Sequence, residues 1–281
     1  MAIITLTTDL GDKDIYQAAL KGSIYKLLPS VNIVDITNSV AAFNVQQAAF
    51  ILKNSFYYFP EDTVHLIGID TVYNDHTKYL AVRYKKHYFV GADNGIFSLM
   101  FDQDPEEIVE INIMQDLKFL HFPLADIFVK AACHLAQGGK LTEIGIPVHD
   151  IENKMNLQPV IEKNLIKGVV IYIDSFQNVI TNITKEFFNN VQQGRRFVLN
   201  FKRNETINHL SWHYNEVPVG EKLCLFGISD HLEIAINKGN ASGLLGLNLT
   251  PLLDAVKQTV NETFAFVGAQ LGLIVKALQN L

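Results

Sequence analysis

Three aspartates stand where a carboxylate could act on a small ligand. Asp9 comes after the β-rich run 3–7, and Asp70 follows the β-rich run 64–69. Ligands of open α/β sheets bind beyond the carboxyl ends of the strands, where a carboxylate can accept hydrogen bonds from a ribose diol. A second carboxylate there can orient a water molecule for attack. We therefore expect Asp9 to bind a ribose and Asp70 to act on water, while Asp174 follows a β-rich run in the second half of the chain.

Local sequence also allows simpler roles for these residues. Asp9 or Asp14 could cap the helix that follows, because aspartate is a good N-cap residue. Asp70 could be an ordinary aspartate at the start of a loop. In the second half, Phe176 could stack on a planar ring and Asn178 could hydrogen-bond its edge, or the segment could be a hairpin with one core aromatic.

The histidines and cysteines do not indicate a metal site. His76, His121 and His134 have no metal-motif spacing and no carboxylate companion at a helical interval. Cys133 and Cys224 lie far apart in apolar runs, so we expect two buried thiols in a reducing compartment. The sequence therefore predicts a cytoplasmic protein without a bound metal.

The composition favours a small-molecule partner. The 281 residues include 48% hydrophobic residues and carry a formal net charge of −6, which argues against nucleic-acid or anionic-membrane binding. The amino terminus lacks the basic and apolar regions of a secretory signal. The apolar segment 264–278 is shorter than the roughly 20 residues of a spanning helix. We expect a packed terminal helix there, with a membrane-surface or oligomer-contact helix as the alternative.

The pattern of elements predicts two domains. In residues 1–150, short β-rich runs alternate with helical runs, which indicates an α/β domain with a largely parallel sheet and flanking helices. Residues 151–165 form a charged linker without clear periodicity. Residues 166–281 contain short β-rich runs between turn signals and predict a small antiparallel β-barrel with a helical C-terminal tail.

Seven ordered segments between residue 3 and about residue 247 resemble one family: the S-adenosylmethionine-cleaving enzymes that include hydroxide adenosyltransferases, fluorinases and chlorinases. They are TTDLGDKDIY at 7–16, IVDITN at 33–38, the run 59–70, VGADNG at 90–95, DIF at 126–128, IDSFQNVITNI at 173–183, and LEIAIN with GNA at 232–241. The family counterparts include TTDFGxxDxY, IVDITH, VGPDNG and LEIAVNxGNA.

The resemblance implies a larger α/β domain, a small C-terminal barrel and a homotrimer that binds S-adenosylmethionine between subunits. Halide or water-derived hydroxide then displaces methionine from the ribose C5′, so S-adenosylmethionine is the substrate and no cofactor is expected. By position, Asp9 holds the ribose. The other implied ligand contacts are Phe43 and Phe176 beside the adenine, Asn178, Asn240 and Ala241 at its edge, and Asp174 and Ser229 at the amino-acid group.

The catalytic segment departs from the family pattern. Hydroxide-using members combine an aspartate, an arginine and a histidine, and Asp70 keeps the first of these, which favours hydroxide over halide. Thr77 stands at the arginine position with Lys78 beside it, and Pro123 stands at the histidine position with His121 two residues earlier.

Two hypotheses follow from these departures. The chain is either an adenosine-forming S-adenosylmethionine hydrolase with Asp70, His121 and Lys78 as a rearranged unit, or a weak or inactive protein that binds S-adenosylmethionine or adenosine. Losing members of a catalytic unit costs orders of magnitude in rate, whereas binding rests on other residues.

Overall fold

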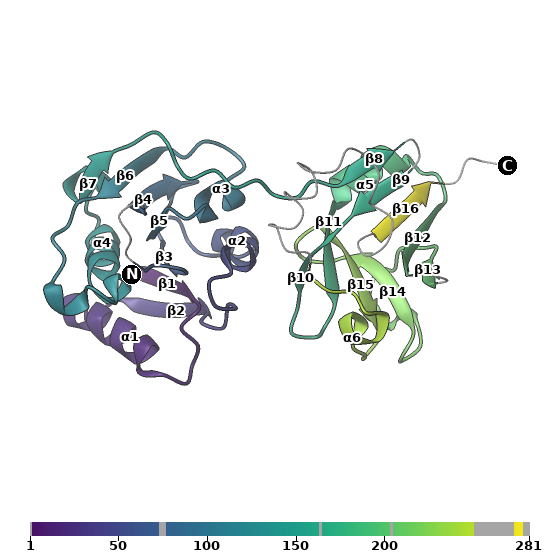
Figure 1. The fold of residues 1–281 in the computed structure, drawn as a ribbon, viewed down its shortest axis with the longest axis horizontal. Coiled ribbons are helices and arrows are strands. Elements are labelled where there is room, and N and C mark those ends of the chain that lie inside the picture. The colour runs from purple at the N-terminus through teal and green to yellow at the C-terminus, as the bar shows by residue number, and fades with distance from the viewer. Residues whose placement is uncertain (1, 73–76, 163–164, 203–204, 250–272, 278–281) are drawn as a thin grey trace. The chain divides into compact units, whose positions relative to one another are not determined.

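The computed structural model describes residues 2–72, 77–162, 165–202, 205–249 and 273–277 (Figure 1). The chain divides into two compact units, Met1–Met155 and Asn156–Leu281. The segment that we expected to be a linker contributes strand β8 (Val160–Glu162) to the second unit.

The described residues of the first unit build a mixed seven-stranded sheet of order β2-β1-β3-β5-β4-β6-β7. Parallel pairing joins β1 to β2 and β3, and β3 to β5, whereas β4, β6 and β7 join by antiparallel pairing. The predicted large, mostly parallel sheet is thus confirmed. The strands are β1 (Ile3–Thr8), β2 (Asn32–Thr37), β3 (Val64–Gly68), β4 (Tyr79–Tyr84), β5 (His87–Ala92), β6 (Glu107–Ile111) and β7 (Gly145–Pro147).

Helices cover both faces of this sheet, because its strands alternate apolar side chains between two cores. In β3, Val64 and Leu66 belong to one core with residues of α1 and α4, while Ile67 belongs to the other core with residues of α2 and α3. Figure 1 shows the two helix pairs on opposite sides of the strands. The helices are α1 (Ile15–Leu27), α2 (Val45–Lys53), α3 (Ile96–Met100) and α4 (Ile127–Ala136), with short 3₁₀ turns η1 (Phe56–Tyr58), η2 (Leu117–Phe119), η3 (Pro123–Ala125) and η4 (Leu141–Glu143).

The first unit also buries a row of polar side chains across three neighbouring strands. Thr5 Oγ1 lies 2.7 Å from His65 Nδ1, and His65 Nε2 lies 3.2 Å from His87 Nδ1. The ring of Phe89 stacks on His65, with centroids 4.8 Å apart. Burial and the neighbouring His87 lower the pKa of His65 from 6.5 to about 3, and burial lowers the pKa of His87 against the opposing effect of nearby carboxylates. His65 is therefore a neutral core residue.

The described residues of the second unit form two antiparallel sheets, of order β10-β11-β15-β14 and β13-β12-β16-β9-β8. The prediction of a mainly β second half is confirmed. Among the described residues, no strand of one sheet pairs with a strand of the other. The further elements are β9 (Leu165–Gly168), β10 (Val170–Ile173), β11 (Val179–Thr184), α5 (Lys185–Gln192), β12 (Phe197–Lys202), β13 (Glu205–Ile207), η5 (Tyr214–Glu216), β14 (Lys222–Phe226), β15 (His231–Ile236), α6 (Ala241–Leu245) and β16 (Leu273–Ala277).

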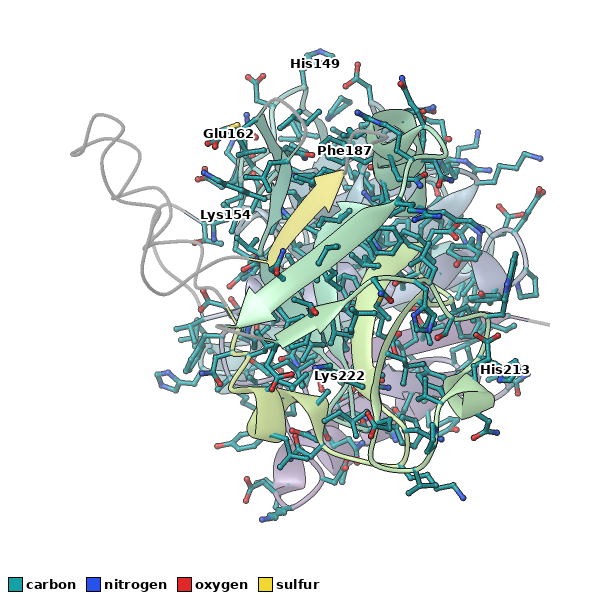
Figure 2. The ribbon with its side chains drawn as sticks, turned by 90° about the vertical axis from the view of Figure 1, so that its right-hand side faces the viewer. His149, Lys154, Glu162, Phe187, His213 and Lys222 are labelled. Carbon is teal, nitrogen blue, oxygen red and sulfur yellow. The ribbon has the colours of Figure 1, made fainter. Side chains whose placement is uncertain are left out.

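Strand β16 differs from the terminal helix that we expected at 264–278. Residues 273–277 are extended and pair on both sides, with Val275 opposite Ile166 of β9 and Leu199 of β12 (Figure 2). The β-branched pair Ile274 and Val275 favours extended backbone, and two neighbouring strands satisfy its backbone groups. The remainder of the expected helix, 264–272 and residue 278, lies outside the described residues.

Candidate functional site

Asp9 lies directly after β1, and its carboxylate accepts a hydrogen bond from a distant part of the chain. Its Oδ2 atom accepts a hydrogen bond of 2.8 Å from the backbone N–H of Phe43, and its own N–H donates to the carbonyl of Gly68 at 3.3 Å. Asp9 is therefore not the cap of α1. Asp14 occupies the N-cap position of that helix, but its side chain makes no capping hydrogen bond.

The turn that carries Phe43 presents an aromatic ring to solvent. Phe43 is 65% exposed and has a left-handed backbone with φ of 63°. A non-glycine residue in this region is strained, and such strain is held at functional sites by surrounding contacts. Here the hydrogen bond from Phe43 N–H to Asp9 holds the turn against the end of β1.

Asn38 ties the same strand end to β2. Thr8 Oγ1 donates to Asn38 Oδ1 at 2.8 Å, and the N–H of Gly11 donates to the Asn38 carbonyl at 2.7 Å. Asn38 is 5% exposed. Asn38 therefore fixes the loop after Asp9, a role that the sequence did not reveal.

Asp70 follows β3, the neighbour of β1, and is exposed. Its backbone is left-handed, with φ of 47°. Asn94 Nδ2 donates to the carbonyl of Ile69 at 2.9 Å and so ties the segment before Asp70 to the turn after β5. The structure thus brings Asp9 and Asp70 to the carboxyl ends of adjacent parallel strands, as the sequence predicted.

The other two predicted catalytic residues make no described contact with Asp70. Lys78 Nζ lies 3.5 Å from Glu110 Oε2 in an ion pair on the antiparallel side of the sheet. His121 is exposed in the turn between η2 and η3. The described residues show no hydrogen bond or ion pair among Asp70, Lys78 and His121, and the segment 73–76 between the first two, which includes His76, lies outside them.

A buried carboxylate anchors the loop that carries His121. Asp126 Oδ2 accepts a hydrogen bond of 2.8 Å from the N–H of Asp116, and Lys130 Nζ lies 2.6 Å from Asp126 Oδ1. Lys130 Nζ also donates to the carbonyl of Met114. The loop before His121 is therefore fastened to the first turn of α4.

In the second unit, Asp174 organises the turn between β10 and β11. Its Oδ1 atom accepts hydrogen bonds from the N–H groups of Phe176 at 2.9 Å and Asn178 at 2.8 Å, and Oδ2 accepts one from Asn178 Nδ2 at 3.0 Å. Gln177 has a left-handed backbone with a φ of 67°, and its carbonyl accepts a hydrogen bond from the N–H of Ser242. The turn is thereby held against α6.

The remaining predicted ligand contacts lie in this turn, in the turn before β15 and at the start of α6. Phe176 is 80% exposed, whereas Asn178 is buried. Asn240 caps α6, because its Oδ1 accepts from the N–H of Gly243 at 2.6 Å. Ala241 is fully buried in the core, and Ser229 lies in the turn between β14 and β15. Phe176 and Asn240 are therefore exposed, whereas Asn178 and Ala241 are buried.

Sequence reasoning missed a buried carboxyl beside Asp174. Tyr214 Oη donates to Glu233 Oε1 at 2.6 Å, and Glu233 is 6% exposed. Burial raises the pKa of Glu233, the hydrogen bond from Tyr214 opposes this rise, and the charge of Asp174 adds to it. Burial and Glu233 raise the pKa of Tyr214. The signal was a glutamate inside the otherwise apolar run of β15.

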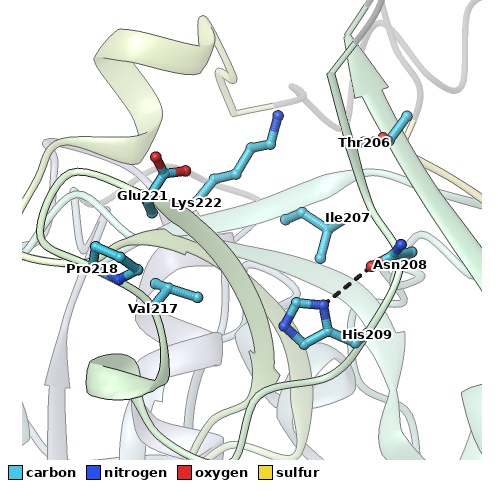
Figure 3. Close-up of a pocket in the computed structure, with 8 residues that line it drawn as sticks. All are labelled: Thr206, Ile207, Asn208, His209, Val217, Pro218, Glu221 and Lys222. Carbon is cyan, nitrogen blue, oxygen red and sulfur yellow. Dashed lines mark hydrogen bonds between the residues drawn. The ribbon is translucent and has the colours of Figure 1, made fainter.

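A separate hollow of about 350 Å³ lies between β13 and the start of β14 (Figure 3). Figure 3 shows His209 beside Asn208. His209 Nδ1 lies 3.2 Å from Asn208 Oδ1. None of the predicted site residues lines it. The lining residues are Thr206, Ile207, Asn208, His209, Val217, Pro218, Glu221 and Lys222.

The described residues contain no group of three or more His, Cys, Asp and Glu side chains placed to hold a metal ion. Both cysteines are free and buried, as predicted, and burial raises the pKa of Cys133 to about 11 and of Cys224 to about 12. Within the described part of the chain, no helix has the length and apolar character needed to cross a membrane.

Two domain profiles match the chain. The SAM hydroxide adenosyltransferase N-terminal domain matches residues 4–145, and the C-terminal domain of the same name matches residues 168–253. The two matches fall in the two units and cover most of the sequence. The chain therefore belongs to the SAM hydroxide adenosyltransferase family.

Individual proteins show the same relationship. The (R)-S-adenosyl-L-methionine hydrolase of Methanocaldococcus jannaschii is 28% identical over 266 residues, which span 88% of this chain and 92% of that protein. The hydrolase of the same name from Thermus thermophilus is 27% identical, with 88% and 96% covered. A fluorinase of an Actinoplanes species is 23% identical over 64% of this chain and 71% of its own.

Solved structures support the fold. The crystal structure of an uncharacterized conserved protein from Thermotoga maritima has a TM-score of 0.80 and 27% identity, and the match covers 99% of this chain and 100% of that one.

Proposed function

We propose that the chain hydrolyses S-adenosylmethionine to adenosine and methionine by attack of water or hydroxide at the ribose C5′. The observation that carries this proposal is the pair of carboxylates at the ends of β1 and β3. Asp9 and Asp70 follow adjacent parallel strands, where sheet proteins of this type bind nucleosides. In this proposal Asp9 binds the ribose and Asp70 orients the water.

The strained backbone at Asp70 supports the second of these roles. A left-handed aspartate at a strand end costs energy that the surrounding hydrogen bonds must offset. Its exposed carboxylate is accessible to a water molecule and to a sulfonium substrate. Attack in line with the departing sulfonium requires a positioned water, and a fixed carboxylate supplies both orientation and a proton acceptor.

In this proposal the remaining ligand contacts are those that the resemblance implies. Phe43 of the first unit and Phe176 of the second unit have exposed rings, which suit stacking on an adenine. Asn178, Asn240 and Ala241 lie along its edge, where Ala241 contributes its backbone because its side chain is in the core. Asp174 and Ser229 receive the amino-acid group.

We also propose a cytoplasmic homotrimer, with the small barrel and the intersubunit ligand site that the resemblance implies, and S-adenosylmethionine as substrate without a cofactor. Light scattering tests the assembly: the proposal expects about three times the chain mass of 31.6 kDa. A monomer in the presence and absence of S-adenosylmethionine contradicts it.

The test of the activity is to incubate the purified protein with S-adenosylmethionine, with and without chloride, and to separate the products by chromatography. We expect adenosine in both cases, because Asp70 suits hydroxide. A 5′-halo-adenosine that forms only with halide contradicts the choice of nucleophile.

A second function is binding of S-adenosylmethionine or adenosine without turnover. The observation that favours it is the position of Lys78, which pairs with Glu110 and not with Asp70. His121 likewise makes no described contact with Asp70. Calorimetric binding without product formation over a long incubation supports this second function.

A further inference from the structure

Glu233 lies at an unusual place for a carboxylate. It faces Ile180 of β11 and Leu225 of β14 in the middle of the four-stranded sheet, and it is 6% exposed. Removing a carboxylate from water is costly unless a partner compensates its charge.

Among the described residues, one of its two carboxylate oxygens has a hydrogen-bond partner. Tyr214 Oη donates to Oε1, whereas Oε2 accepts no hydrogen bond from the described residues. Oε2 points toward Gly227, where an added Cβ atom would lie only 2.6 Å away. A glycine at this position leaves room for the carboxylate under the turn that carries Ser229.

No described basic side chain compensates the negative charge around Glu233. Asp174 lies close enough to raise the pKa of Glu233 and of Tyr214. The described lysines, arginines and histidines form no ion pair with either carboxylate. Two neighbouring acidic groups without a protein cation favour a ligand cation, and the free Oε2 atom offers it a hydrogen-bond acceptor.

We propose that Glu233, oriented by Tyr214, binds the primary ammonium group of the ligand's amino-acid portion together with Asp174. An ammonium carries three N–H donors, and carboxylate oxygens accept them in short, charge-assisted hydrogen bonds. A sulfonium has no N–H donor, so this contact selects the amino-acid end of S-adenosylmethionine. The inference rests on the proposed function, which supplies a ligand with such a group.

The test compares two ligands that differ in that group. Affinities for S-adenosylmethionine and for adenosine are measured by calorimetry on the wild type, Glu233→Gln and Tyr214→Phe. Glu162→Gln is the matched control, because Glu162 pairs with Lys167 at 2.7 Å on an exposed strand. Melting temperatures confirm that each variant is folded, and Tyr214→Phe, which removes a single hydroxyl, serves if Glu233→Gln does not fold.

We expect Glu233→Gln to weaken S-adenosylmethionine binding by about 10- to 100-fold, the range for a hydrogen bond to a charged group. Tyr214→Phe should weaken it less, by about three- to tenfold, because Tyr214 orients Glu233 and does not itself contact the ligand. Both variants should bind adenosine within about twofold of wild type, and Glu162→Gln should bind both ligands like wild type.

Equal losses for both ligands, or unchanged affinity for S-adenosylmethionine, overturn this inference while leaving the proposed function intact. Failure of the wild type to bind either ligand refutes the proposed function and this inference with it.

Discussion

The buried histidine row predicts a specific loss of stability in acid. His65 is neutral in the folded first unit, with a pKa lowered to about 3. In the unfolded chain its pKa returns to 6.5, so the unfolded state takes up a proton as the pH falls below that value, and the folded state does not. Its contribution to stability is therefore complete above pH 6.5, declines as the pH falls toward 3, and declines no further below 3.

The size of this effect follows from the two pKa values. Between pH 7.5 and pH 5 the unfolded state gains about 2 kcal/mol from protonation of His65, while the folded state gains almost nothing. His87, whose pKa is also lowered by burial, adds to the loss in the same direction.

Native-state hydrogen exchange of the β3 amides, corrected for intrinsic exchange rates, reports the stability of the first unit. His65→Gln keeps hydrogen-bonding groups near Thr5 and His87 but cannot titrate. We expect this variant to be less stable at neutral pH and to lose about 2 kcal/mol less than wild type between pH 7.5 and 5. His149→Gln, at an exposed position, should keep the wild-type pH dependence. An equal pH loss in His65→Gln and wild type, or a His65 imidazole that titrates near 6.5 by NMR, would falsify this reasoning.

Three further predictions concern the candidate site and its support. Asp70→Asn should lower adenosine formation at least about 100-fold, while the affinity for S-adenosylmethionine stays within a few fold of wild type. Product assays and calorimetry check this, with Asp102→Asn as a surface control. Full activity of Asp70→Asn contradicts the prediction. His121→Ala should lower turnover similarly if the shifted histidine acts with Asp70, and intact turnover removes His121 from the mechanism. Gly68→Ala should lower stability by about 1–3 kcal/mol, because its Cβ would lie 2.4 Å from Leu124 Cδ2; an unchanged melting temperature contradicts this.

The sequence predicted the sheet and the positions of its strand-end carboxylates well. Apolar runs before Asp9 and Asp70 specify strands, and parallel strands place the residues after them at one edge. The sequence could not distinguish a capping aspartate from a ligand-binding one, because both follow a strand and precede a helix. The structure decides between them: Asp14 occupies the N-cap position of α1, and the Asp9 carboxylate accepts a hydrogen bond from the N–H of Phe43, 34 residues away.

Long-range contacts also explain what sequence reasoning missed. The hydrogen-bond partner of Glu233 is Tyr214, which lies in η5, 19 residues earlier in the chain. No local sequence pattern links the two residues. The expected terminal helix was apolar enough for either conformation, and pairing with β9 and β12 selects a strand at 273–277. Short apolar runs are ambiguous by periodicity alone.

The position of β16 has a consequence for biosynthesis. This strand joins β9 to β12 in the middle of its sheet, yet the ribosome makes it after every other strand that the structure describes. Until it emerges, the nascent second unit holds two half-sheets with unpaired inner edges, which are templates for wrong pairing. Premature termination upstream of residue 273 therefore yields a chain whose first unit can fold but whose second unit is prone to aggregate, a product that quality-control proteases should remove.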